Sequence, residues 1–188
     1  LDRACVGVAG LGGLGSHIAV LLARLGIGRL VLADFDTVDV TNLHRQHYTM
    51  HDLGHAKADA LHTQLMAINP YLDYRAYTIR VTHENAATLF ADCDVVCEAF
   101  DRADQQAMLI EALLAGLPDT VVVSGSGMAG YGSASEIHTE RRFARLYVCG
   151  DGTSDIADGI GLLAPRVALC AAQQATMALR LLLGRTEP

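Results

Sequence analysis

The sequence predicts an α/β fold: a Rossmann-like wound sheet, mostly parallel with late antiparallel strands, with helices on both faces. Strand-like runs alternate with helix-like runs, which is the pattern of a wound sheet. A glycine-rich turn at residues 10–15 separates the first expected strand from the first expected helix. Hydrophobic residues make up 51% of the chain and aromatic residues only 5%, so small aliphatic side chains must build the core, as in a parallel sheet covered by helices. We expect a single domain over residues 1–188.

The first half of the chain alternates regularly between strands and helices. Ile18, Leu21, Leu22 and Leu25 recur at i, i+3, i+4 and i+7 and predict a helix over residues 13–25. Glycines follow directly, as is typical of a helix end. The other expected elements are strands at residues 4–9, 29–33 and 72–79 and a helix at 55–68 that ends at an Asn-Pro pair. Residues 34–52 are polar, so we expect an irregular segment there.

The second half is less regular. We expect strands at residues 95–99 and 120–124, with a helix at 104–115 between them and a glycine-rich segment at 125–132 after them. Two late strands are expected at residues 134–138 and 145–149, antiparallel to each other. A long helix rich in Ala and Leu follows at residues 163–183 and begins near Pro165.

The bulk composition excludes some classes of partner. The formal net charge of −7 argues against duplex DNA and anionic membranes, because both select basic surfaces. No apolar run reaches transmembrane length. The five cysteines form no C-x-x-C pair, and their odd number indicates a reducing compartment, so we expect a cytoplasmic protein. The chain begins at Leu1 with strand signal at once, and we expect that an N-terminal segment is missing.

The glycine-rich turn is the first candidate binding element. Gly10, Gly12, Gly13 and Gly15 fit the pattern G-x-G-x-x-G between a strand and a helix. Glycines allow the tight turn and the close approach of a phosphate, and the helix N-terminus offers free N–H groups and a positive dipole end. The motif predicts a nucleotide site, and the alternative is a plain tight turn.

Acidic residues follow the second expected strand. Asp34 lies 24 residues after Gly10, where a carboxylate can hold a ribose hydroxyl pair. The alternative is an exposed acidic strand end. Asp36 and Asp39 follow Asp34, and such a cluster repels phosphates unless cations or a metal accompany it.

Candidate cations come next in the chain. Asn42, Arg45 and Gln46 lie in an expected loop, and Lys57 lies near the start of the next helix. An arginine offers a planar fork to phosphate oxygens and a lysine a compact point charge. Arg45 and Lys57 are therefore expected to reach a triphosphate. Taken singly, either residue is as readily a solvated surface cation.

Asp101 follows the expected strand at residues 95–99. Ligands of a wound sheet lie beyond the carboxyl ends of its strands, so Asp101 and Asp34 should face one crevice. Mg²⁺ prefers one or two carboxylates together with phosphate oxygens, and we expect Asp101 to bind it. The alternative is an acid at a helix N-terminus, ahead of Asp104.

Together these stretches resemble the ThiF/MoeB family, the bacterial relatives of ubiquitin-activating enzymes. The resemblance covers nearly the whole chain. The stretches that carry it are Gly10-Leu-Gly-Gly-Leu-Gly-Ser16, Asp34-Phe-Asp36, Asn42-Leu-His-Arg-Gln46, Lys57, Ile68-Asn-Pro70 and Asp101. The Asn-Leu-x-Arg-Gln stretch is the most specific of them. Segments such as Ala99-Phe-Asp101, Gly127-Met-Ala-Gly130, Cys149-Gly-Asp151 and Gly161-Leu-Leu-Ala-Pro-Arg166 are most similar to the short form of the thiamine-biosynthesis ThiF proteins.

The resemblance implies roles for the matching residues. It implies that Gly12 and Gly13 lie against ATP, that Asp34 holds the ribose and that Asp101 binds Mg²⁺. The phosphates would contact Asn42, Arg45 and Lys57, and the other expected nucleotide-binding residues are Gly10, Asp36, Gln46 and Arg102. Arg45, Lys57 and Asp101 are the expected catalytic residues.

The resemblance also implies the reaction and its partners. The family substrate is a ubiquitin-like sulfur-carrier protein that ends in Gly-Gly, which is ThiS in the thiamine case. Its terminal carboxylate attacks the α-phosphorus of ATP, and pyrophosphate leaves. A homodimer is implied as well, and the apolar final helix and the glycine-rich segment are the surfaces we expect at its interface.

The chain departs from the family in several places. Many members carry two C-x-x-C pairs that bind zinc, and this chain has none, so we expect no structural zinc. Arg102 stands where many relatives have Asn after the metal-site Asp. Family members also bring an N-terminal arginine from the partner subunit into the site, and Arg3 is not its expected equivalent.

Cys149 is the candidate for sulfur transfer. Some relatives use a cysteine of their later half to form an acyl-disulfide or persulfide with the carrier. Cys149 fits that role if its thiol is exposed and its thiolate is favoured. The alternative is an inert strand cysteine, because Asp151 and Asp155 oppose a thiolate.

Three alternative functions stay open at this point. The glycine turn with Asp34 also fits an NAD-dependent oxidoreductase, although that leaves residues 42–46 and Lys57 without a role. A molybdopterin-type carrier is an alternative substrate within the family. The third is a scaffold that binds a carrier protein without turnover.

Overall fold

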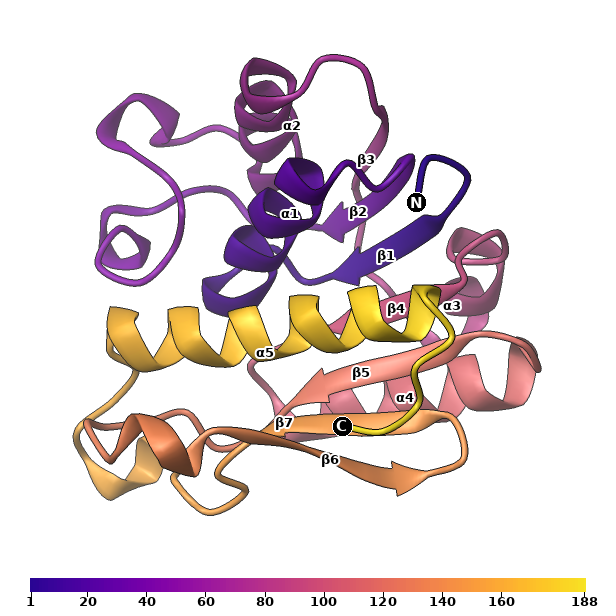
Figure 1. Cartoon of the computed structure of the whole chain (residues 1–188). Helices are drawn as coiled ribbons and strands as arrows, with labels where there is room; N and C mark the ends of the chain where they lie inside the picture. The colour runs from indigo at the N-terminus through magenta and orange to yellow at the C-terminus, as the bar shows by residue number, and fades with distance from the viewer.

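One sheet of seven strands runs through the described part of the molecule, in the order β3-β2-β1-β4-β5-β7-β6 (Figure 1). The computed structural model describes residues 1–188 except the side chain of Asp158. The strands are β1 (Cys5–Ala9), β2 (Arg29–Asp34), β3 (Asp73–Thr78), β4 (Val95–Glu98), β5 (Val121–Gly125), β6 (His138–Phe143) and β7 (Leu146–Gly150). All neighbours pair in parallel except β6 and β7, which are antiparallel. The predicted mostly parallel sheet with late antiparallel strands is confirmed.

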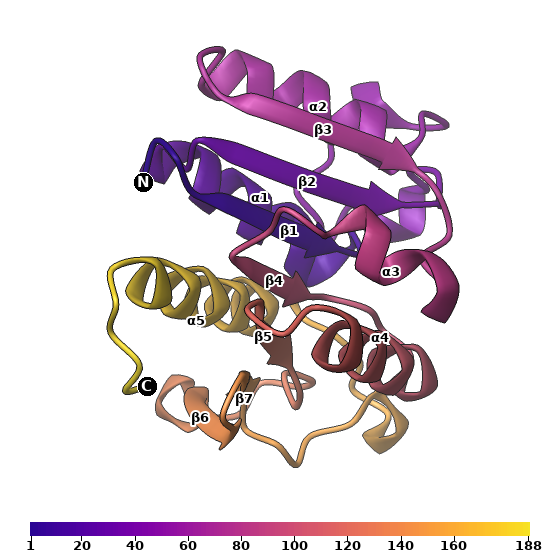
Figure 2. The same cartoon turned by 90° about the vertical axis from the view of Figure 1, so that its right-hand side faces the viewer.

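Helices cover both faces of the sheet, as predicted (Figure 2). One face carries α1 (Gly13–Leu25), α2 (Lys57–Ile68) and α5 (Ala164–Leu182), and the other carries α3 (His83–Leu89) and α4 (Ala103–Gly116). Each face has its own hydrophobic cluster, and β1, β4 and β5 contribute side chains to both clusters. The central strands are buried on both sides, so their sequences read as continuous apolar runs.

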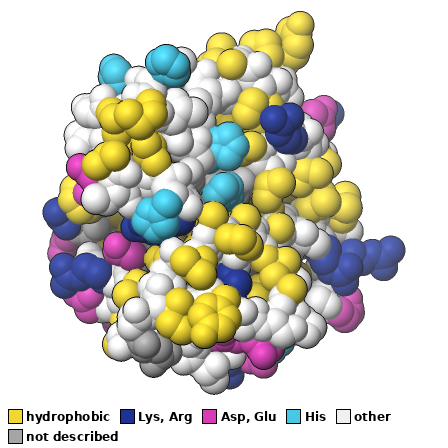
Figure 3. Space-filling view, turned by 90° about the vertical axis from the view of Figure 1, so that its left-hand side faces the viewer, with side chains coloured by type: hydrophobic (Ala, Val, Ile, Leu, Met, Phe, Trp, Pro, Cys, Tyr) yellow, Lys and Arg dark blue, Asp and Glu magenta, His cyan; other side chains and the backbone are white. Residues whose placement is uncertain are grey.

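The strand order places a crevice at the edge where the parallel strands end. β1 lies between β2 and β4. The chain therefore adds β2 and β3 next to one edge of β1 and later adds β4 next to its other edge. Connections after β1 and β4 therefore diverge on opposite faces, which opens a binding crevice at their carboxyl ends. Figure 3 views the molecule from this side.

One expected strand needs correction. Residues 134–138 do not form a strand: Ala134–Glu136 is a short 3-10 helix, whose cap Ser133 accepts a hydrogen bond from the N–H of Ser135. The strand is β6, which starts at His138. It carries charged side chains at the sheet edge, as edge strands often do, so it lacks the apolar run by which strands are recognised.

Helix α3 was not predicted. It is only seven residues long and has a single buried side chain, Ala86, so it carries no clear apolar stripe. Its local signal is the capping box of Thr82 and Asn85, in which the Asn85 side chain accepts from the N–H of Thr82.

The apolar side of α5 is already covered within the chain. Its buried residues include Val167, Cys170, Ala175 and Met177, and they pack on the sheet and on α1. This side of α5 is therefore not available to a partner, and an interface on the rest of the helix surface stays a prediction.

None of the described helices combines the length and the apolar character that spanning a membrane requires.

Candidate active site

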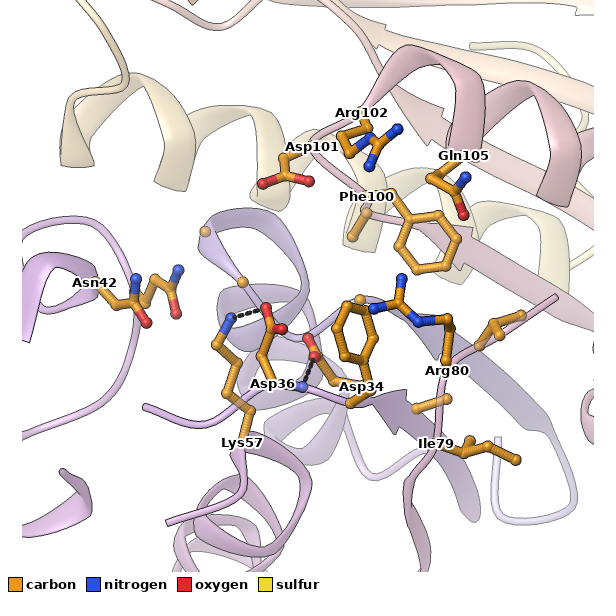
Figure 4. A pocket seen from close by; sticks show the side chains of 18 of the residues that line it. Asp34, Asp36, Asn42, Lys57, Ile79, Arg80, Phe100, Asp101, Arg102 and Gln105 are labelled. Carbon is orange, nitrogen blue, oxygen red and sulfur yellow. Dashed lines mark hydrogen bonds and ion pairs between the residues drawn. The ribbon is translucent and has the colours of Figure 1, made fainter. Parts of the chain in front are cut away.

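A cavity of about 310 Å³ opens at the carboxyl ends of β1, β2 and β4. Every residue predicted for the nucleotide site lines it (Figure 4): Gly10, Gly12, Gly13, Asp34, Asp36, Asn42, Arg45, Gln46, Lys57, Asp101 and Arg102. The fold thus brings together residues that are up to 92 positions apart in the chain (10 to 102). Cys149 is not among the residues that line this cavity.

The glycine-rich turn forms the floor of the cavity. Gly10 has φ +87°, a conformation that favours glycine. A Cβ on Gly15 would lie 1.8 Å from the carbonyl oxygen of Gly10, so only glycine lets α1 start this close to the turn. The N-cap, Gly12, provides no side-chain hydrogen bond. The first N–H groups of α1 are therefore available to an anion in the cavity.

Asp34 ends β2 and is locked in place. One carboxylate oxygen accepts the N–H of Leu11 at 2.6 Å and the other accepts the N–H of Asp36 at 2.8 Å. The residue is 7% exposed. These bonds tie β2 to the glycine turn and fix the carboxylate, whose remaining lone pairs suit two ribose hydroxyls.

Lys57 forms an ion pair with one of the acidic residues of the site. It starts α2, its side chain is 7% exposed, and its Nζ lies 3.0 Å from a carboxylate oxygen of Asp36. The Tyr48 hydroxyl donates to the carbonyls of Leu11 and Lys57 at 2.8 and 3.3 Å. Burial raises the pKa of Tyr48, so it stays a donor at neutral pH. Tyr48 thus holds the start of α2 against the glycine turn, and Lys57 is the only lysine of the chain.

The polar loop before α2 presents Asn42, Arg45 and Gln46. The Asn42 side-chain oxygen accepts the N–H of Asp39 at 3.1 Å in a capping box, which leaves its amide NH₂ as the group to bind an anion. Arg45 donates to the carbonyl of Thr41 at 3.0 Å and keeps further N–H groups. Gln46 is 8% exposed, and its Oε1 has no partner among the described residues.

Asp101 and Arg102 differ in their surroundings. No hydrogen bond or ion pair of the described residues engages the Asp101 carboxylate, which faces the cavity (Figure 4). The Arg102 guanidinium instead donates to both carboxylate oxygens of Asp104 at 3.1 and 2.8 Å. Asp104 is the acid of the first turn of α4. The geometry therefore leaves Asp101 free for a ligand and engages Arg102 elsewhere.

The donor set fits Mg²⁺ bound together with phosphates. No group of three or more described His, Cys, Asp or Glu side chains is arranged to hold a metal ion. Mg²⁺ needs only one or two carboxylates when phosphate oxygens and water complete its octahedron. Asp101 would supply such a carboxylate in this cavity.

One end of the cavity was missed by the sequence reasoning. It is lined by Phe35, Ile79, Arg80, Val81, Phe100 and Gln105, and Leu162 also lines the cavity. The Arg80 guanidinium lies 3.6 Å above the Phe35 ring, a cation–π stack. This end suits a flat, apolar base, because aromatic and aliphatic side chains surround it. The positions of these residues in the sequence could have indicated this end. Phe35 lies between two predicted site residues, and residues 79–81 follow β3 at the same edge of the sheet.

Cys149 does not meet the conditions set for sulfur transfer. The residue is 0% exposed, and burial raises the pKa of its thiol to about 11 although the Thr139 hydroxyl lies 3.2 Å away. It lies in β7 next to the core. In this structure the thiol is neither accessible nor readily ionised, which agrees with the alternative of an inert strand cysteine.

Comparison with known proteins shows what this chain is similar to. A sulfur carrier protein adenylyltransferase of Thermus thermophilus is 39% identical over 120 residues, which cover 63% of this chain and 44% of that protein. The adenylyltransferase and sulfurtransferase UBA4 of Kluyveromyces lactis is 34% identical over 194 residues, which cover 98% of this chain and 42% of that protein. The chain thus spans less than half the length of these relatives.

Solved structures share the fold. The E. coli tRNA N6-threonylcarbamoyladenosine dehydratase TcdA, in a crystal structure with ATP, superposes with a TM-score of 0.88 at 23% identity, over 97% of this chain and 87% of that chain. E. coli MccB gives a TM-score of 0.72 at 21% identity and covers all of this chain and 59% of its own.

The model of the ThiF family matches residues 1–188, the full sequence. The specific Asn-Leu-x-Arg-Gln stretch, the glycine turn and Asp101 all meet at one cavity, as the resemblance implied. The chain belongs to the ThiF family.

Proposed function

We propose that this chain binds ATP in the cavity and adenylates the C-terminal Gly-Gly carboxylate of a ubiquitin-like sulfur-carrier protein, releasing pyrophosphate. The single observation that carries the proposal is the convergence on one cavity of the open α1 N-terminus, Lys57 and the unpaired carboxylate of Asp101. The family membership and the adenylyltransferase names of the relatives support it.

The cavity divides into two ends that match the two ends of ATP. The base fits the end that Phe35, Ile79 and Val81 line, and the ribose hydroxyls fit the fixed carboxylate of Asp34. The triphosphate then runs along the first N–H groups of α1 toward the cationic residues of the polar loop and α2.

The chemistry needs positioning more than proton transfer. A carboxylate is ionised at neutral pH and needs no general base to attack the α-phosphorus. The bond from the α-phosphorus to the bridging oxygen breaks, and the electron pair leaves with pyrophosphate. Lys57, Arg45 and Asn42 offset the charge of the phosphates and hold them in line. Asp101 would hold Mg²⁺, and the bound ion would neutralise part of the same charge.

The ion pair between Lys57 and Asp36 positions the Lys57 ammonium group for this step. Asp36 holds the ammonium group within the cavity before ATP arrives, so Lys57 needs little reorganisation to meet a phosphate. A preorganised charge in a site shielded from water stabilises a transition state more strongly than the same charge in water.

Within this function we infer a ThiS-like carrier of thiamine thiazole biosynthesis as the substrate and a reducing, cytoplasmic location. The short-form segments around residues 127–130, 149–151 and 161–166 support the choice of carrier. The alternative is a molybdopterin-type carrier. All five cysteines are free, which agrees with a reducing compartment.

ATP–[³²P]pyrophosphate exchange tests the proposal. We expect exchange that requires both Mg²⁺ and a carrier ending in Gly-Gly, and a ThiS-type carrier should support it better than a molybdopterin-type carrier. A carrier that lacks the last glycine is the matched control. Absence of exchange with every carrier, while ATP binds, would indicate the binding-only scaffold. A thermal shift with NAD but none with ATP and Mg²⁺ would favour the oxidoreductase alternative.

A further inference from the structure

Glu98 is a buried acid outside the cavity whose presence the proposed reaction does not require. It is the last residue of β4 and is 0% exposed. Its carboxylate partners among the described residues are two neutral groups, the N–H of Phe100 and the hydroxyl of Ser124, each at 2.6 Å. Burying an ionisable group without an opposite charge is costly, so a stabilising role for Glu98 does not explain its presence.

The two hydrogen bonds hold the turn that leads from β4 to α4. One carboxylate oxygen accepts from the backbone of Phe100, and the other is tied through Ser124 to the end of β5. On the other side of Phe100, the Gln106 side chain of α4 donates to the Phe100 carbonyl at 2.8 Å. Buried or half-buried side chains therefore fix both peptide groups that flank Phe100.

This turn carries a wall of the nucleotide cavity. Asp101 directly follows Phe100, and its carboxylate has no partner of its own among the described residues, so the backbone before it sets where it points (Figure 4). The turn also rests on the glycine motif: a Cβ on Gly10 would lie 2.8 Å from the Ala99 carbonyl oxygen and 2.9 Å from the Phe100 ring. A shift of the turn that carries Asp101 would therefore also displace the glycine turn on which it rests.

We propose that Glu98 is a positioning residue, which aims the Asp101 carboxylate into the cavity through its hydrogen bonds to Phe100 and Ser124. This inference rests on the proposed function for its effect on activity, but the structural hold on the turn does not depend on turnover. Glu98 itself does not line the cavity and touches no reacting atom.

Three variants separate positioning from stability. Glu98→Met keeps a similar volume but offers no acceptor to Phe100 or Ser124. Glu98→Gln keeps a carbonyl oxygen for the N–H of Phe100 and can donate its amide to the Ser124 oxygen. Thr120→Val is the matched control, because it removes a buried hydroxyl that donates to the Cys93 carbonyl at 2.9 Å, at the opposite end of β5.

Three measurements are made on each variant. Hydrogen–deuterium exchange of the segment at residues 99–106 needs no carrier and no turnover. Pyrophosphate exchange gives kcat/KM for ATP, and the melting temperature records the stability of each variant. We expect Glu98→Met to lose protection over residues 99–106 and to lower kcat/KM by about 10- to 100-fold, while its melting temperature stays near or above that of the wild type.

Glu98→Gln should rescue both the protection and most of the activity. Thr120→Val should lower the melting temperature without the loss in kcat/KM. Wild-type protection over residues 99–106 in Glu98→Met would overturn the proposal, as would a Glu98→Gln variant as impaired as Glu98→Met, or an activity loss that only follows the melting temperature. Absence of pyrophosphate exchange in the wild type would count against the proposed function alone, because the protection experiment still tests Glu98.

Discussion

At the scale of single residues, the buried charged side chains of the molecule include Lys57 and Glu98, which differ in their partners. Lys57 is paired with Asp36, so its charge is partly compensated within the cavity. Glu98 has no such partner, and burial, against the effect of the Ser124 and Phe100 hydrogen bonds, raises the pKa of its carboxyl to about 7. The first residue is placed to meet an anion, and the second is placed where its ionisation costs stability.

Replacing Lys57 tests its role in the transition state. Lys57→Ala should cost about 2–4 kcal/mol of transition-state stabilisation in adenylation, which is the scale of one preorganised charge contact. The measurement is kcat/KM in pyrophosphate exchange. Arg29→Ala is the control, because Arg29 pairs with Asp73 at the opposite end of β2. Exchange at nearly the wild-type rate in Lys57→Ala would refute the assignment.

The buried carboxyl of Glu98 predicts a pH-dependent stability. Between its ordinary pKa of 4.5 and its folded value of about 7, the folded protein keeps a proton that the unfolded chain releases. The free energy of unfolding therefore falls as pH rises through this window. The nearby thiols of Cys97 and Cys170 do not titrate there, because burial raises their pKa.

Glu98→Gln removes this dependence. Relative to the wild type, its free energy of unfolding should rise by roughly 2–3 kcal/mol between pH 5 and pH 8. Urea denaturation at both pH values measures the difference. Thr120→Val should show a difference from the wild type that does not change with pH, and a pH-independent difference for Glu98→Gln would show that Glu98 does not titrate in this window.

At the scale of elements, the start of α1 joins β1 to the cavity. Three contacts hold it: the Asp34 carboxylate on the N–H of Leu11, the Tyr48 hydroxyl on the carbonyl of Leu11, and the Ser16 hydroxyl on the carbonyl of Gly12 at 2.6 Å. Each leaves the first N–H groups of the helix unused. The element is therefore built as a rigid anion site whose donors are kept for a ligand.

Gly15→Ala tests how closely α1 must approach the turn. The new Cβ would lie 1.8 Å from the Gly10 carbonyl oxygen, so backbone must move, and we expect a loss of at least about 2 kcal/mol in the free energy of unfolding. Gly26→Ala is the matched control. Gly26 has φ +78° but no atom within 4 Å of the added Cβ, so its cost should be about 1–2 kcal/mol from the conformation alone. Equal losses for both variants, measured by urea denaturation, would contradict this account.

At the scale of the whole molecule, the topology gathers the site. The glycine turn, β2, the polar loop and the end of β4 come from four parts of the chain and meet only because β1 lies between β2 and β4. Hydrophobic side chains remain exposed elsewhere, among them Tyr131 at 77% and Phe143 at 69%. Figure 3 shows hydrophobic side chains gathered on the face at which the parallel strands end. A large contiguous patch of exposed apolar side chains can mark a subunit contact.

The family resemblance predicts a homodimer. Size-exclusion chromatography with light scattering should give a mass of twice the chain mass of 20.0 kDa. We expect a charge in the glycine-rich segment, as in Tyr131→Glu, to weaken the dimer, because this segment is one of the two surfaces predicted for the interface. Tyr71→Glu is the control, since Tyr71 is 93% exposed on the loop before β3. A single-chain mass for the wild type would refute the dimer.

The sequence alone determined the elements that have strong local signals. The glycine turn, α1, β2 and the Ala- and Leu-rich α5 combine a clear apolar period with a start or stop residue, so their types and approximate bounds followed from the residues. Spacing motifs also identified the polar end of the cavity, because glycines and cations of a phosphate site recur at recognisable distances.

Only the tertiary structure decided the rest. β6 is a strand because β7 pairs with it, although its own residues are charged. The base end of the cavity and the role of Glu98 depend on contacts between residues far apart in the chain, such as Glu98 with Ser124. The tertiary structure likewise decided that the Cys149 thiol is buried and not accessible. Pairing, enclosure and long-range contact are properties of neighbours in space, and no local pattern in the sequence encodes which neighbours a residue will have.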